Sequence, residues 1–211
     1  MTSYAIALDI GTSGFRAQAI DLSNQSIVST ALTIRHPLPG ANVIDHVNFA
    51  IETGEIESNK LMIQTVNNLI HHLKVNTKKV SRMAICGNPF QLSLFQNIEI
   101  RDLAYAGRNV WETLKFTPPK RDGDVISAKE LGLDLCSDAQ VFIPPAVGHE
   151  IGADALAMLL LTGAMEESEP CIVIDYGTNA EMALVSGGHI YTGSAAAGPA
   201  LEGQEVRMGM L

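Results

Sequence analysis

Two stretches of the chain share one pattern of apolar and polar positions. Each has an apolar run that ends in an aspartate, then a glycine beside small polar residues, then a second apolar run. The first copy spans residues 5–21 and contains Asp9, and the second spans residues 171–186 and contains Asp175. Apolar runs of this length are typical of strands and the glycine favours a tight turn, so we expect two β-hairpins. Each turn would present backbone N–H groups and a carboxylate at one point.

The pattern between the two hairpins predicts strands and helices in alternation. The alternation in Ser26–Thr33 predicts a third strand, antiparallel to the first hairpin. Apolar residues near helical spacing predict a helix over Glu55–Leu73, and apolar runs predict short strands over Val80–Cys86 and Val141–Ile143. These elements predict an α/β domain in which an antiparallel hairpin joins parallel crossovers.

Other segments carry weaker patterns. A short capped helix is expected at Ser127–Glu130, and a longer helix is expected from about residue 149 or 151 to 161. Residues 90–97 fit either a helix or a connection, and residues 101–117 show no assignable pattern.

The composition limits the classes of function. A chain of 211 residues with 46% hydrophobic content can bury a sizeable core, so it is expected to be globular. The net charge of -9 argues against nucleic acid as a partner. No apolar run is long enough for a membrane span, and no signal pattern opens the chain. The cysteines are far apart and form no iron–sulfur or zinc pattern; they are Cys86, Cys136 and Cys171. Reduced thiols and a cytoplasmic location are expected.

The repeated pattern also predicts how the chain divides into domains. An acidic break at residues 166–170 separates a first unit, residues 1–165, from the beginning of a second similar unit, residues 166–211. The similarity of the two hairpins suggests duplication of a fold unit. Because the second unit is far shorter than the first, we interpret the chain as a fragment or as a protein completed by a partner.

The paired aspartates are the main candidates for chemistry. Asp9 and Asp175 each follow an apolar strand, where an unpaired carboxylate is costly. As a pair they would hold Mg²⁺, mostly through water, beside the phosphates of ATP. For either aspartate taken alone, the alternative is that its carboxylate only caps the tight turn after its own strand. Asp154, near the start of a predicted helix, could reach the metal or an attacking water, or could only complement the helix dipole.

Small and hydroxyl residues surround these acids. Gly11 and Gly177 would let a phosphate approach the backbone, or would only permit the tight turn. Thr12, Ser13, Thr178 and Asn179 would donate hydrogen bonds to phosphate oxygens, although ordinary turn chemistry also explains them. Gly198 lies in a run of small residues after the second hairpin, where a ligand could approach the backbone.

Longer motifs carry a resemblance to a known family, and together they cover nearly the whole chain. They are Leu8–Arg16, His36–Gly40, Cys86–Pro89, Glu99–Gly107, His149–Ala157, Asp175–Glu181 and Ala195–Gln204. With these motifs the sequence is similar to the ATP-dependent reductive activators of corrinoid proteins, of the type that activates methylamine methyltransferases. These belong to the acetate and sugar kinase/Hsp70/actin (ASKHA) superfamily.

The resemblance implies duplicated ribonuclease-H-like domains with a mixed sheet, which close on Mg-ATP. It also implies a function: ATP hydrolysis is coupled to reduction of a corrinoid protein from cob(II)amide to cob(I)amide, in support of a methyltransferase. Asp9, Gly11, Thr12 and Ser13 would form the first phosphate loop, and Asp175, Gly177, Thr178 and Asn179 would form the second. In the family the electron comes from a separate iron–sulfur region. Since this chain has no cysteine cluster, an electron donor protein or a missing iron–sulfur domain would supply it.

Two alternatives stay open. One is a small-molecule or sugar kinase of the same superfamily, for which Asp154 is the candidate base for the phosphate acceptor. The other is a scaffold that docks a corrinoid protein without catalysing any reaction.

Overall fold

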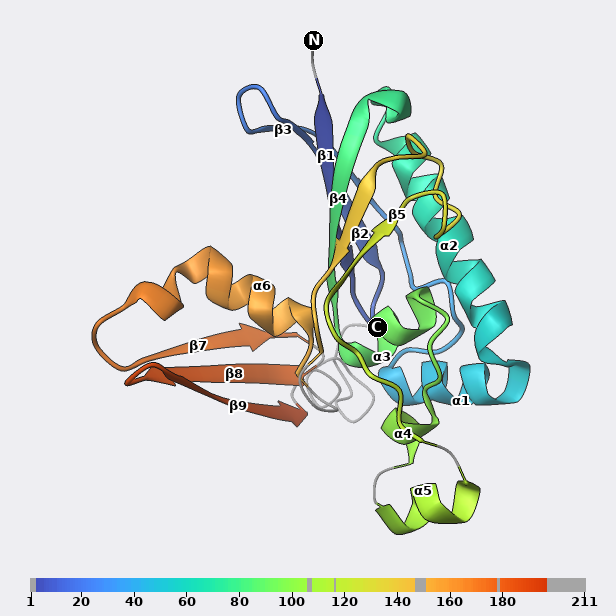
Figure 1. Ribbon diagram of the computed structural model, residues 1–211, viewed down its shortest axis with the longest axis vertical. Coiled ribbons are helices and arrows are strands. Elements are labelled where there is room, and N and C mark those ends of the chain that lie inside the picture. Colours follow the sequence, from blue (N-terminus) through green and yellow to red (C-terminus); the bar gives the residue numbers. More distant parts are fainter. Residues whose placement is uncertain (1–2, 106–107, 116, 147–150, 178, 197–211) are drawn as a thin grey trace, which may run out of the picture.

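A six-stranded mixed sheet forms the larger part of the molecule (Figure 1). The computed structural model describes residues 3–105, 108–115, 117–146, 151–177 and 179–196. The strand order is β3-β2-β1-β4-β6-β5. The strands are β1 (Tyr4–Ile10), β2 (Phe15–Asp21), β3 (Ser26–Leu32), β4 (Val80–Gly87), β5 (Asp124–Ser127) and β6 (Gln140–Ile143). β1, β2 and β3 are antiparallel, β4 and β6 run parallel to β1, and β5 closes the edge antiparallel to β6.

Helices cover one face of this sheet. The inner face of β1 presents Ile6, Leu8 and Ile10, which are all at most 2% exposed, because side chains alternate along a strand. The long helix α2 (Glu55–His72) buries an apolar stripe against this core; the stripe contains Met62, Val66, Leu69 and Ile70. The remaining helices of this part are α1 (Val43–Thr53), η1 (Thr77–Lys79), α3 (Pro89–Phe95), α4 (Arg101–Ala104) and α5 (Arg108–Leu114).

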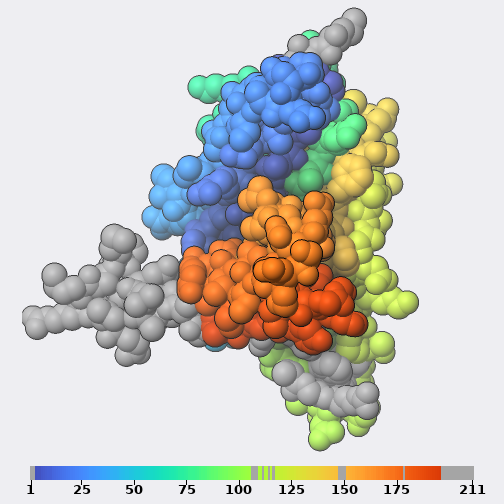
Figure 2. All heavy atoms as spheres, turned by 90° about the vertical axis from the view of Figure 1, so that its left-hand side faces the viewer, coloured from blue at the N-terminus to red at the C-terminus, as the bar shows by residue number. Residues whose placement is uncertain are grey.

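A second, smaller sheet lies against one end of the first (Figures 1 and 2). It contains β7 (Cys171–Tyr176), β8 (Asn179–Ser186) and β9 (His189–Ala196) as an antiparallel meander. Helix α6 (Ala153–Thr162) covers it, followed by η2 (Ala164–Glu166), and Leu159 of α6 packs with Ala183 and Val185 of β8 in a small core of their own. No helix in the described part of the chain is long and apolar enough to cross a membrane.

A buried polar network joins α1 and α3 to the loop after β3. The rings of His36 and His46 stack with centroids 3.9 Å apart. Leu38 N–H donates to His36 Nδ1, His36 Nε2–H donates to Gln91 Oε1, and Gln91 Nε2 donates to His46 Nδ1, each at 3.0 Å. These bonds require both imidazoles to be neutral, with the proton on Nε2. His46 Nε2 has no hydrogen-bond partner among the described residues.

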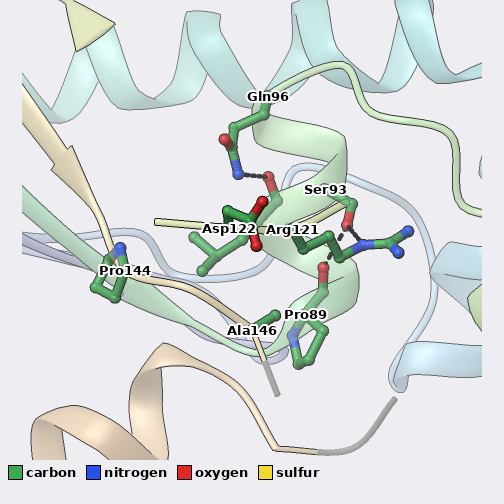
Figure 3. Close-up of a pocket in the computed structure, with 8 residues that line it drawn as sticks. Pro89, Ser93, Gln96, Arg121, Asp122, Pro144 and Ala146 are labelled. Atoms are coloured by element: carbon green, nitrogen blue, oxygen red, sulfur yellow. Dashed lines mark hydrogen bonds between the residues drawn. The ribbon is translucent and has the colours of Figure 1, made fainter. Parts of the chain in front are cut away.

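Arg121 anchors the loop that precedes β5 (Figure 3). Its guanidinium donates to both carboxylate oxygens of Asp102, at 2.6 and 2.9 Å, and Nε donates to Ser93 Oγ at 2.7 Å. A further bond of 2.8 Å goes to the carbonyl oxygen of Glu99. The hollow beside it holds about 10 Å³, close to the size of one water, so we assign this cluster to stability and not to ligand binding.

The structure confirms most of the predicted elements and corrects some. Both hairpins, the third strand, the helix over α2, the strand β4 and the helix α6 lie where the pattern predicted them. The predicted helix at Ser127–Glu130 is wrong. β5 ends at Ser127, and Ala128 N–H still bonds to the Ala139 carbonyl beside the sheet, at 2.9 Å. Ser127 Oγ accepts the Glu130 N–H at 3.2 Å, but Gly132 has φ +70, which ends the turn.

Seven elements of the described chain had no sequence prediction: α1, η1, α4, α5, β5, η2 and β9. α1 begins after Asn42, whose side chain accepts the Asp45 N–H at 3.0 Å. β5 has only four residues and pairs with β6 at the sheet edge, so its position depends on contacts distant in sequence.

Candidate functional site

The turns of the two hairpins face one cleft at the junction of the two sheets. The cleft holds about 450 Å³. In the first turn, Gly14 N–H bonds to the Gly11 carbonyl at 3.3 Å, and Thr33 Oγ1 receives the Phe15 N–H at 2.8 Å. In the second turn, Gly177 N–H bonds to the Asn179 carbonyl at 2.8 Å. The lining residues are Asp9, Ile10, Gly11, Thr12, Ser13, Gly14, Arg16, Gly87, Asn88, Asp154, Asp175, Tyr176, Gly177, Asn179 and Glu181.

The end of β4 supports the first turn. Asn88 Nδ2 donates to Thr12 Oγ1 at 3.2 Å, while Asn88 Oδ1 caps α3 by accepting the Gln91 N–H at 3.0 Å. Gly87 has φ +156, and a Cβ there would lie 2.8 Å from the Ile10 carbonyl oxygen. Gly87 and Asn88 therefore line the cleft, and Asn88 also holds Thr12 in place.

Helix α6 begins at the floor of the cleft. Gly152, its N-cap residue, lies so close to β4 that a Cβ would be 2.6 Å from the Gly87 carbonyl oxygen and 2.8 Å from Asn88 Cα. This contact places Asp154, in the first turn of α6, beside the two hairpin turns. Burial raises the pKa of Asp154, the backbone N–H of Ala155 lowers it through a bond of 2.9 Å, and the charges of Asp9 and Asp175 raise it again.

The carboxylate of Asp9 has a mixed environment. Burial raises its pKa most strongly, the Cys86 thiol and Arg16 lower it, and the charge of Asp175 raises it. Cys86 Sγ donates to Asp9 Oδ1 at 3.8 Å. Burial and the charges of Asp9 and Asp154 raise the pKa of the Cys86 thiol to about 12, so this cysteine is a protonated donor and not a thiolate.

Glu181 is a site residue that the sequence analysis did not assign. It lies at the beginning of β8, only 8% exposed, directly opposite Asp175 in the β7–β8 ladder. Burial, followed by the charges of Asp154 and Asp175, raises its pKa to about 7. The signal available in the sequence was its place on the face of β8 that also presents Ala183 and Val185, where an acid interrupts an apolar row. Arg16, Asn88 and Tyr176 also line the cleft without having been predicted.

The charge of the cleft is strongly negative. Four carboxylates line it, on Asp9, Asp154, Asp175 and Glu181, and among the described lining residues only Arg16 is cationic. No group of three or more potential ligand side chains converges on one point in the described part of the chain. Asp9 and Asp175 present carboxylate oxygens to the cleft, and these are ligands of the type that Mg²⁺ prefers.

The cysteines do not fit an iron–sulfur cluster. Cys86 contacts Asp9, Cys136 lies near η1, where its N–H bonds to the Thr77 carbonyl, and Cys171 begins β7. All three are free thiols. Clusters of this kind need several cysteines around one centre, so we derive no electron-transfer step through these residues.

The structure brings most of the predicted site residues together. One cleft contains eight of them: Asp9, Gly11, Thr12, Ser13, Asp154, Asp175, Gly177 and Asn179. The other two, Thr178 and Gly198, lie outside the described residues, so their predicted roles have no structural description. The roles of all these residues stay predictions, because the geometry shows only that they meet.

Comparison with known proteins gives the family. The model of the RACo middle region matches residues 4–167, and the model of the C-terminal domain of RACo, the ASKHA domain, matches residues 169–211. The chain is 53% identical over 209 residues to the [Co(II) methylated amine-specific corrinoid protein] reductase of Methanosarcina barkeri, and 27% identical over 214 residues to the corrinoid activation enzyme RamQ of Eubacterium limosum. It covers 39% and 34% of the lengths of these two relatives.

Solved structures agree with this assignment. A reductive activator for a corrinoid, iron-sulfur protein superimposes with a TM-score of 0.83 at 27% identity, over 99% of this chain and 33% of that one. A 2-dehydro-3-deoxygalactonokinase from Sinorhizobium meliloti, at a TM-score of 0.52 and 16% identity over 90% of this chain and 53% of that one, shares the fold alone. With its mixed α/β sheet and these matches, the chain belongs to the RACo family of reductive activators of corrinoid proteins, within the ASKHA superfamily.

Proposed function

We propose that this chain is the nucleotide-binding part of an ATP-dependent activator that reduces a corrinoid protein from cob(II)amide to cob(I)amide. The observation that carries the proposal is the meeting of both hairpin turns and four carboxylates in one cleft. The 53% identity to a corrinoid protein reductase supports the choice of partner. The chain spans about two-fifths of the length of that relative, so the complete reaction is part of this proposal.

In the proposed complex the two turns bind the phosphates of ATP. Backbone N–H groups of the first turn and the hydroxyls of Thr12 and Ser13 donate to phosphate oxygens from one side, and Asn179 donates from the other. Asp9 and Asp175 hold the waters of Mg²⁺. Bound Mg²⁺ neutralises phosphate charge, which this acidic cleft otherwise repels. Asp154, at the floor of the cleft, lies where it can hold a water of the metal or the attacking water.

ATP could then control contact with the corrinoid partner. The two turns belong to different sheets, so a ligand that bridges them favours the closed arrangement of the two units. The family models meet between residues 167 and 169, close to our proposed boundary at residue 165, although α6, which precedes this boundary, packs on the second sheet. The electron comes from a donor protein or an iron–sulfur domain, since the cysteines of this chain do not form a cluster.

A sugar kinase of the same fold is less well supported. The kinase structures 2-dehydro-3-deoxygalactonokinase and xylulose kinase resemble this chain at 16% and 12% identity. Such a likeness supports a shared fold, but not a shared substrate that accepts the phosphate. A kinase also needs a sugar that Asp154 could deprotonate. Consumption of ATP that depends on an added sugar would favour this alternative.

The test is calorimetric titration of the chain with Mg-ATP. We expect saturable binding that falls at least tenfold in the Asp9→Asn and Asp175→Asn variants, and Asp138→Asn, on an exposed turn, controls for loss of one negative charge. A second titration with a corrinoid protein, with and without Mg-ATP, asks whether ATP changes its affinity. A folded chain that does not bind Mg-ATP would contradict the proposal, and ATP-independent binding of the corrinoid protein would favour the scaffold alternative.

A further inference from the structure

Glu181 occupies a position in which a carboxylate has no structural use. Residues 181, 183 and 185 share one face of β8, and the other two are alanine and valine packed against Leu159 of α6. Glu181 continues this buried row to the hairpin end, where it reaches the cleft. An apolar residue or a glutamine would fill the same place at less cost, because burial of an ionised carboxylate is unfavourable without a partner.

The surroundings of Glu181 offer no compensation in this structure. No described residue donates a hydrogen bond to its carboxylate, and the charges that act on it, Asp154 and Asp175, are both negative. Asp175 is its direct cross-strand neighbour, a pairing in which like charges destabilise a sheet. Arg16, the one cation among the described lining residues, acts on Asp9 instead. A buried, unpartnered acid aimed into a ligand cleft indicates that its partner arrives with the ligand.

The position of Glu181 separates it from the proposed phosphate donors of the first turn. The donors of the first turn, Gly11 to Ser13, lie across the cleft on β1–β2, whereas Glu181 lies on β8 behind the second turn. Asp175 is exposed, while Glu181 is nine-tenths buried. A carboxylate does not bind a phosphate directly, because both are negative, but it can accept hydrogen bonds from a water that lies between them.

We propose that Glu181 orients the water that attacks the terminal phosphate of ATP. This inference rests on the proposed binding of Mg-ATP in the cleft. It gives Glu181, on β8, a role in the hydrolysis of ATP and not in its binding. The water oxygen bonds to the terminal phosphorus while the bond from that phosphorus to the bridging oxygen breaks. ADP leaves with the bridging oxygen and its electron pair, and the proton of the water ends on the released phosphate. Glu181 accepts a hydrogen bond from the water and fixes its direction of approach.

The test separates turnover from affinity. Glu181→Gln keeps the size of the side chain but replaces one acceptor oxygen with a donor, so we expect ATP hydrolysis to fall by about 10²–10⁴-fold, the usual range for a positioned acid–base side chain. Affinity for Mg-ATP, measured by calorimetry, should stay the same or increase, because a negative charge near the phosphates is removed. Glu181→Asp, with a shorter arm, should retain part of the rate. The matched control is Glu169→Gln, on the exposed segment before β7.

The outcomes distinguish this inference from the proposed function. A wild-type chain that fails to bind Mg-ATP refutes the nucleotide site itself. If the wild type binds, hydrolysis by Glu181→Gln within threefold of wild type overturns the role of Glu181. So does a tenfold loss of Mg-ATP affinity in a folded variant, which would make Glu181 a metal ligand or a structural acid. Binding by the wild type with no hydrolysis also overturns it, while leaving the nucleotide site intact.

Discussion

The buried histidine pair should make the fold sensitive to acid. His36 is 6% exposed, and burial, followed by the charge that His46 can acquire, lowers its pKa from 6.5 to about 3. Its Nδ1 accepts the Leu38 N–H, so a proton at Nδ1 would meet another donor and break this bond. The neutral form is therefore the one that the folded chain holds.

The size of the effect follows from linkage. The folded state binds a proton at His36 less readily than the unfolded state, so the stability is fully present above pH 6.5 and is lost as the pH falls toward 3. Each pH unit well below 6.5 costs about 1.4 kcal/mol. Between pH 7.5 and pH 5.0 the loss from this one group comes to about 2 kcal/mol, a large part of the stability of a typical domain.

Urea unfolding followed by circular dichroism measures this loss. His36→Gln keeps an N–H that can donate to Gln91 and removes the titration, at a constant cost for the lost Leu38 bond. The stability difference between wild type and variant should therefore shrink by about 2 kcal/mol from pH 7.5 to pH 5.0. His72→Gln, at an exposed position of α2, is the control. It measures how much the pH dependence of the unfolding free energy changes when a surface histidine is removed. A difference between wild type and His36→Gln that stays constant over this range would refute the reasoning.

Three further predictions test the Arg121–Asp102 pair, the close contact of Gly152 and the proposed metal. Arg121→Met leaves the carboxylate of Asp102, whose side chain is 4% exposed, without its partner, and should cost about 3–5 kcal/mol in urea unfolding. Lys60→Met, in the exposed pair with Glu57, should cost about 1 kcal/mol or less, and an equal loss in both variants would contradict the assignment. Gly152→Ala forces a Cβ to within 2.6 Å of the Gly87 carbonyl oxygen and should destabilise by about 1–3 kcal/mol. Gly193→Ala, whose nearest neighbour would be Met182 Cε at 3.9 Å, is its control and should change stability little. Removal of Mg²⁺ with a chelator should weaken ATP binding at least tenfold, since four carboxylates line the cleft, and calorimetry that shows equal affinity would refute the role of the metal.

Much of the local structure could be read from the sequence. The two hairpins follow from apolar runs broken at glycine, and α2 follows from apolar residues at helical spacing, because these features act within a few residues of one another. The prediction of a helix at Ser127–Glu130 was wrong because it used only features of neighbouring residues. A serine with an acid three residues later does form the cap bond, but the backbone continues the edge of the sheet through Ala128 and Ala139.

The sequence by itself predicted most of the candidate site residues, and only the tertiary structure decided that they meet and added Glu181 to them. Asp9 and Asp175 could be paired in advance because their motifs repeat. Asp154 and Glu181 have no such signal, and their places depend on the close crossing of Gly152 over β4 and on the α6–β8 contact. The raised pKa of Glu181 has the same origin, since it depends on burial and on charges that packing brings near. Local patterns determine strands and turns, whereas a cleft between two sheets is a property of packing over long sequence distances.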